Sequence, residues 1–262
     1  MTAVPPSVAA RPDVGRPAAF WPLVRLTARG LLGRRRSLGV VALAAAPVLV
    51  AAIIAIAGGL RDRETVALGS FSTLTLGLVV PLAALILGTA ALGTLIDDGT
   101  IVYVLVKPVP RRTVVLAAML VAAVATSALT SAAALLAGIL VLGLASPSLL
   151  AGMVAGALIA STLYVAVFVA LSVFTSRALV IGLGYVIVWE GFVTSLLSGT
   201  RILSIREYAR AVVVAIAGDG ATGTDRVGVE LPVAGVLSIA ILAIAFVLAT
   251  YRLARFEVGE AG

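Results

Sequence analysis

The stretch Thr113–Phe174, TVVLAAMLVAAVATSALTSAAALLAGILVLGLASPSLLAGMVAGALIASTLYVAVFVALSVF, decides the fold of this chain. None of its residues is charged, and it is about three times as long as the roughly 20 residues that one transmembrane helix needs. A turn signal, Ala-Ser-Pro-Ser at 145–148, divides it. We therefore predict two transmembrane helices, at 113–144 and 149–174, joined by a short turn.

Apolar runs continue on both sides of this pair. They cover about 38–60, 66–96, 178–198 and 231–250. The chain is 61% hydrophobic and 12% charged, whereas a soluble domain carries about 25% charged residues. Its mean hydropathy is +1.20. We predict an all-α membrane protein with six transmembrane helices. The first run starts near Leu38 and is longer than the apolar part of a signal peptide, so we expect no cleaved signal.

The basic residues indicate the orientation of these helices. The chain carries a net charge of +7, and its arginines lie at the ends of the apolar runs rather than among aromatic residues, which argues against nucleic-acid binding. Of the 19 lysines and arginines, 13 fall on the side that holds the N-terminus. The positive-inside rule then places both termini in the cytoplasm. We expect a multi-pass protein of the bacterial cell (inner) membrane.

The terminal segments differ from the membrane-spanning part. We predict a disordered tail at 1–16, because it is rich in proline and alanine. At 17–37, apolar residues mix with Arg25 and Arg29, which lie four residues apart on one helical face. This pattern predicts an amphipathic helix in the cytoplasmic interface, although the arginines could serve only as topology anchors. The transmembrane domain is expected at 38–250 and a cytoplasmic tail at 251–262.

A short apolar segment lies between the second and third runs. Six apolar residues from Ile101 are too few to cross a membrane, and Asp98 can cap a short helix that begins near Thr100. Lys107 suits the other end of that helix, and Pro108 with the following proline stops it. An exposed apolar helix needs a partner or the membrane surface. A purely topological interfacial helix is the alternative.

This loop resembles the cytoplasmic loop of ABC-2-type permeases, the six-span membrane subunits of ABC transporters. The resemblance rests on Asp98-Gly99-Thr100, the apolar residues that follow, and Lys107-Pro108-Val109-Pro110-Arg111. It implies an ABC-2 (type V exporter-like) architecture with an N-terminal elbow helix at 17–37, a cytoplasmic coupling helix, and outer re-entrant or surface helices. It also implies a dimer of membrane subunits with two separate ATPase chains. The docking residues would be Asp97, Asp98, Gly99, Thr100, Tyr103, Lys107, Pro108, Pro110 and Arg111.

The loop departs from the family pattern at two places. The family often has glutamate where Asp97 and Asp98 stand. It also often has Gly-Lys a turn or two after the arginine, where this chain has Ala117-Ala118-Met119. Docking by the loop remains the expectation, while any role of that lysine does not carry over.

The chain itself has no nucleotide-binding motif. A P-loop needs Gly-x-x-x-x-Gly-Lys-Ser/Thr, and the one lysine, Lys107, precedes a proline. We therefore expect this chain to be no enzyme and to bind no cofactor, with ATP–Mg held by the partner ATPase. Cysteine and histidine are both absent, which removes thiol, imidazole and disulfide chemistry, and we predict no metal site.

Glu190 is the one acid inside a predicted span. An ionised carboxylate in a membrane is costly, so it should face the bundle interior or water. We regard it as a candidate for the substrate path or gate. Alternatively, Trp189 sits in the aromatic belt and Glu190 reaches the outer headgroups. The segment Arg201–Ala217 resembles the outer re-entrant or surface helices of the family, and Gly152, Gly156 and Ala160 form a small-residue stripe that we assign to packing.

Three functions remain open from the sequence. The first is an ATP-driven permease exporting a drug, a lipid or another amphipathic molecule. The second is a proton-coupled secondary transporter, which usually has more buried acids and a visible internal repeat. The third is a non-catalytic assembly subunit of a membrane complex. An intramembrane enzyme would need an acid pair or a Ser–Lys pair within the spans, and neither is present.

Overall fold

The computed structural model describes residues 20–31, 34–58, 62–97, 110–193, 202–218 and 228–255. Every regular element in these ranges is a helix, which confirms the all-α prediction. The elements are α1 (Phe20–Leu31), α2 (Arg34–Ala57), α3 (Arg63–Ser70), η1 (Phe71–Val79), α4 (Val80–Asp97), α6 (Arg111–Leu142), α7 (Pro147–Phe174), α8 (Ala178–Gly184), η2 (Tyr185–Val193), α10 (Ile205–Ala217) and α11 (Leu231–Ala254), where η marks a π-helical segment.

Five helices in the described ranges are long and apolar enough to cross a membrane. They are Leu38–Ala57, Arg63–Gly93, Arg111–Leu142, Pro147–Phe174 and Leu231–Ala254. The predicted fifth span differs from the others, because the described apolar helix there covers only Ala178–Phe192. The rest of that predicted span, from 194 to 198, lies outside the described residues. The multi-pass character is therefore supported by five long apolar helices within the described ranges.

The predicted pair at 113–144 and 149–174 is the helical hairpin α6–α7. Gly143 ends α6 with a positive φ of 67°, a backbone conformation that glycine adopts without strain. Pro147 is the first residue of α7, where its missing N–H costs nothing. Within the hairpin, Thr130 Oγ1 and Ser161 Oγ lie 2.8 Å apart and form a buried hydrogen bond. The turn signal thus predicted both the break and its position.

The second apolar run forms one continuous helical rod from α3 through η1 to α4. Asp62 caps its start by accepting from the amide of Thr65 at 3.1 Å and from its hydroxyl at 2.6 Å. These bonds, the hydroxyl foremost, hold the pKa of the Asp62 carboxyl below its usual range. The π-helical turns end where Val80 donates to the carbonyl of Thr75, just before Pro81, which has no N–H to donate.

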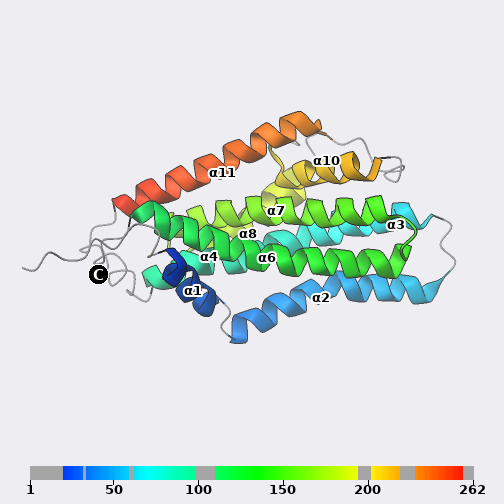
Figure 1. Ribbon diagram of the computed structural model, residues 1–262, viewed down its shortest axis with the longest axis horizontal. Helices are drawn as coiled ribbons and strands as arrows, with labels where there is room; N and C mark the ends of the chain where they lie inside the picture. Colours follow the sequence, from blue (N-terminus) through cyan, green and yellow to red (C-terminus); the bar gives the residue numbers. More distant parts are fainter. Residues whose placement is uncertain are drawn as a thin grey trace, which may run out of the picture.

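α7 lies at the centre of the bundle. It packs against α4, α6, α10 and α11, and residues around its whole circumference are buried. By contrast, α2 and α11 lie along opposite sides of the bundle (Figure 1). Large apolar side chains of α11, including Val236, Ile239 and Val247, are exposed there. Such surfaces suit a helix whose outer face contacts lipid.

α1 lies within the segment predicted as an interfacial elbow helix. It packs against α6 and α4 at the end of the bundle that also holds the end of α4, the start of α6 and the end of α11 (Figure 1). The guanidinium of Arg25 lies 5.8 Å from the Trp21 ring centroid, within the range of a cation–π contact. A second helix, α2, begins at Arg34.

Candidate functional site

The fifth apolar run and the segment after it form two helical parts that we call the broken pass, because Glu190 in the first part bonds to Ser204 and Ile205 at the start of the second. α8 and η2 run together from Ala178 to Val193, and α10 follows from Ile205. Seven residues of α10 are buried, and the helix packs mainly against α7. Of the two alternatives predicted for 201–217, an outer re-entrant helix or a surface helix, α10 does not fit the surface helix because it packs into the bundle. The physical reason is its apolar face, which buries better against α7 than against water.

The small-residue stripe of α7 is the surface on which α10 lies. A Cβ at Gly152 would come within 2.9 Å of the carbonyl oxygen of Val213. A Cβ at Gly156 would lie 2.6 Å from a methyl of Val213 and 3.2 Å from the carbonyl oxygen of Ala209. Only glycine lets two backbones approach this closely. The packing role predicted for this stripe thus has a definite partner, α10.

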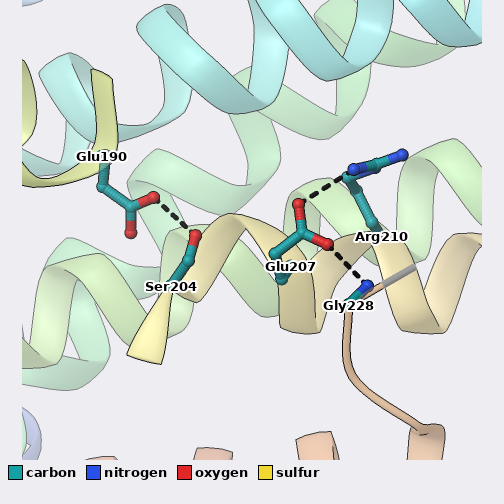
Figure 2. A network of polar contacts seen from close by, with 5 residues as sticks. All are labelled: Glu190, Ser204, Glu207, Arg210 and Gly228. Carbon is teal, nitrogen blue, oxygen red and sulfur yellow. Dashed lines mark hydrogen bonds and ion pairs between the residues drawn. The ribbon is translucent and has the colours of Figure 1, made fainter. Parts of the chain in front are cut away.

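Glu190 lies at the break and caps α10 from the preceding half of the pass (Figure 2). Its side chain is only 2% exposed. One carboxylate oxygen accepts from Ser204 Oγ at 2.7 Å, and the other accepts from the amide of Ile205 at 3.0 Å. Ser204 makes no cap bond of its own, so the carboxylate of Glu190 satisfies a free amide at the positive end of the helix.

The burial of Glu190 argues against the interpretation in which it reaches the outer headgroups, and its role in a substrate path or gate stays a prediction. A carboxylate that reached the outer headgroups would be exposed, whereas Glu190 is buried and bonded inside the bundle. The Tyr164 hydroxyl is buried without a hydrogen-bond partner among the described residues, and it lies in the electrostatic field of Glu190 and Arg206. Tyr164 stands past the middle of α7 and is fully buried. The site is therefore a polar cluster deep within an apolar bundle.

Arg206 follows the capped amide by one residue and extends toward η1. A Cβ at Gly77 would lie 3.4 Å from its Nη1 atom, so the absence of a side chain at Gly77 makes room for the guanidinium. The Nε atom of Arg206 is buried without a hydrogen-bond partner. Gly77 belongs to one π-helical segment and Glu190 to the other. Such segments are rare and are frequent at functional sites.

A second buried acid, Glu207, bonds within α10 and to the segment before α11 (Figure 2). Its side chain is 3% exposed and forms an ion pair of 2.9 Å with Arg210. Its other oxygen accepts from the amide of Gly228 at 3.1 Å, which links α10 to the segment before α11. Glu207 was not predicted as a site residue from the sequence. The available signal was an acid in the first helical turn with an arginine three residues later.

The predicted docking loop lies almost entirely outside the described residues. Asp97 is the last residue of α4, Pro110 precedes α6 at its N-cap, and Arg111 is the first residue of α6. The C-terminal end of α4 and the N-terminal end of α6 lie at the same end of the bundle (Figure 1). The remaining predicted docking residues, Asp98, Gly99, Thr100, Tyr103, Lys107 and Pro108, fall between them and outside the described ranges.

Arg111 has one structural feature that bears on a docking role. Its Nη1 atom is buried and has no hydrogen-bond partner among the described residues, whereas the next residue, Arg112, is exposed. The Arg111 side chain as a whole is only partly buried, so the guanidinium can donate to a carboxylate or phosphate of a partner. The two neighbouring arginines therefore differ in environment although they are identical in chemistry.

Within the described ranges, no group of three or more acidic side chains is placed to hold a metal ion. Comparison with protein families and with curated proteins finds no match to this chain.

Proposed function

We propose that this chain is the membrane-spanning subunit of a transporter driven by a separate ATPase. The observation that carries the proposal is the broken fifth pass, with the buried carboxylate of Glu190 at the break. Ionisable residues buried in membrane bundles mark transport paths, and interrupted helices are typical of the sites where transporters handle their cargo. A chain that only anchored a complex would have no need for this costly arrangement.

The energy source is inferred from the opposite end of the molecule. The sequence between Asp97 and Arg111 resembles the ATPase-docking loop of ABC-2-type permeases, and the chain has no P-loop of its own. α1, the C-terminal end of α4 and the N-terminal end of α6 lie at the same end of the bundle. In the proposed complex, two ATPase chains dock on two copies of this subunit and their closure moves α4 and α6. Export of a drug, a lipid or another amphipathic molecule is the expected direction and cargo class.

The paired arginines at the start of α6 allow a sharp test of docking. The full chain is purified from its native membrane together with any P-loop ATPase that accompanies it, and ATP hydrolysis is measured in lipid vesicles. We expect R111A to weaken ATPase stimulation and co-purification, because the partly buried guanidinium of Arg111 stands at the start of α6 beside the predicted docking loop. The matched variant R112A should leave both unchanged. The proposal fails if no ATPase accompanies the chain, and the docking surface is wrong if both variants behave like the wild type.

A proton-coupled secondary transporter is the second candidate, favoured by the burial of Glu190. The two mechanisms differ in what drives cargo movement. A proton-coupled carrier would move cargo in vesicles under a pH gradient without ATP, and E190Q would abolish that coupling because a glutamine carries no titratable proton. An ATP-driven permease would show no transport under a pH gradient alone.

A further inference from the structure

An apolar groove opens between the end of α7, the start of the broken pass and α11. Its volume is about 440 Å³, within the range of about 300–1,000 Å³ typical of small-ligand sites. Apart from the Tyr185 hydroxyl, the side chains around it are purely hydrocarbon. Its walls are formed by Phe168, Leu171 and Phe174 of α7, Ile181 of α8, and Ile244 and Leu248 of α11, among others.

Arginines stand at one mouth of this groove. Arg177 precedes α8 by one residue, and its carbonyl accepts from the amide of Ile181 at 3.1 Å, so the two residues lie one turn apart. On α11, Arg252 follows the groove residue Leu248 by four positions, also one turn. The α7–α8 turn and the end of α11 lie at the same end of the bundle (Figure 1).

The depth of the groove matches one leaflet of a bilayer. The deepest groove residue on α11 is Ile241, and the distance along the helix from there to Arg252 is about 16 Å at roughly 1.5 Å per residue. Half of a hydrocarbon core of about 30 Å is about 15 Å. The arginines therefore stand at headgroup level when the groove lies in hydrocarbon.

A third arginine follows Arg252 on α11. Arg255 follows Leu248 by seven positions, two turns along the same face of α11, and its guanidinium lies 4.3 Å from the Tyr251 ring centroid. This contact holds the charge beside the helix end. The positive-inside rule assigns this end to the cytoplasmic leaflet, which is the leaflet that carries anionic lipids.

We propose that the groove binds an acyl chain of an anionic phospholipid from the cytoplasmic leaflet, with its phosphate on Arg177 and Arg252. The apolar walls recognise the chain, and the guanidinium groups recognise the charged headgroup through charge-assisted hydrogen bonds. Two chemically different parts of one molecule are thus matched by two adjacent parts of the protein. The inference is independent of the energy source proposed above.

The test measures lipid retention by native mass spectrometry of the full chain in detergent, titrated with phosphatidylglycerol or phosphatidylcholine. We expect the protein to retain phosphatidylglycerol in preference. The variant R177Q/R252Q should lose about fivefold in affinity for each arginine removed. R63Q is the matched control, because Arg63 is an exposed arginine at the other end of the bundle. A loss with R63Q as large as with the double variant would overturn the site.

A second pair of variants tests the groove itself. I244W places a large ring in the groove from a position that is 57% exposed, whereas I239W places the same ring on α11 at a position 69% exposed and outside the groove. We expect I244W to abolish retention of phosphatidylglycerol and I239W to preserve it. Equal retention by both variants would overturn the proposal. If I244W instead converts a dimer into a monomer, and I244W and I239W retain phosphatidylglycerol equally, the groove binds a second copy of the chain and the lipid proposal is wrong.

Discussion

Replacing Glu190 separates the structural role of its hydrogen bonds from the role of its charge. E190A removes both acceptors and leaves the Ser204 hydroxyl and the Ile205 amide without partners. E190Q keeps both bonds, because its carbonyl can accept from the amide while its NH2 group donates to the serine hydroxyl, which is also an acceptor. We therefore expect E190A to destabilise the protein strongly and E190Q only slightly.

The size of the effect follows from the two bonds and their surroundings. In soluble proteins a hydrogen bond to a charged group contributes about 1.5–3 kcal/mol. In membrane proteins, bonds between helices average about 0.6 kcal/mol and reach about 1.7. Because Glu190 is buried within an apolar bundle, the membrane values apply. Two bonds then give a loss of about 1–3 kcal/mol for E190A, and less than about 1 kcal/mol for E190Q.

Trp189, the neighbour of Glu190, provides the probe. The chain has two tryptophans. In a W21F background the tryptophan fluorescence comes from Trp189 alone and reports on the junction between η2 and α10. Unfolding of the full chain is followed by fluorescence during titration of lipid–detergent micelles with sodium dodecyl sulfate, for E190A, E190Q, S204A and the double variant E190A/S204A. The double-mutant cycle isolates the bond between the two side chains from their other contacts.

Two results would refute this reasoning. If E190A unfolds at the wild-type detergent fraction, the cap does not stabilise the junction between η2 and α10. If E190Q is destabilised as much as E190A, the charge rather than the hydrogen-bond geometry matters at the start of α10. Wild-type stability of E190Q with a loss of transport would assign the charge to function.

Three further predictions concern other contacts. G156A should destabilise, because its Cβ would lie 2.6 Å from a methyl of α10 and overpacking costs about 1–3 kcal/mol, whereas G235A, in open space, should gain about 0.5–1 kcal/mol of helix propensity; thermal unfolding in detergent compares them. A double-mutant cycle of T130V and S161A should give a coupling of about 0.6 kcal/mol, and additive effects would contradict the buried bond. The lowered pKa of Asp62 means that its cap stabilises α3 above the unfolded pKa and is lost as the pH falls through the folded pKa. Hydrogen exchange of the first amides of α3 should show this pH dependence in the wild type and none in D62N.

The helical hairpin and the burial of the small-residue stripe were predictable from the sequence. Absence of charge over Thr113–Phe174 requires a lipid environment, and the Ser146-Pro147 turn can only interrupt a helix. The stripe at Gly152 and Gly156 was predicted to pack closely, although its partner was not. The docking residues between Asp97 and Arg111 remain a prediction, tested by the paired arginine variants.

The candidate site was predictable only in part. Glu190 was recognisable as the one acid within an apolar run, but its partners Ser204 and Ile205 stand 14 and 15 residues further along, beyond the end of η2. Glu207 was missed because an acid beside arginines is typical of a solvent-exposed helix face. In the structure the same spacing forms a buried ion pair, since α10 lies against α7 rather than on the surface.

The sequence alone predicted a bundle of apolar helices long enough to cross a membrane. Long uncharged runs in hydrocarbon must satisfy every backbone hydrogen bond internally, and a helix does so within its own segment. The tertiary structure alone decided that the fifth pass is broken, that α10 enters the bundle and that Glu190 caps it. Those contacts join segments that are distant in the chain. Their free energy depends on how deeply the polar groups are buried and how closely the helices approach each other, and no local sequence pattern encodes either.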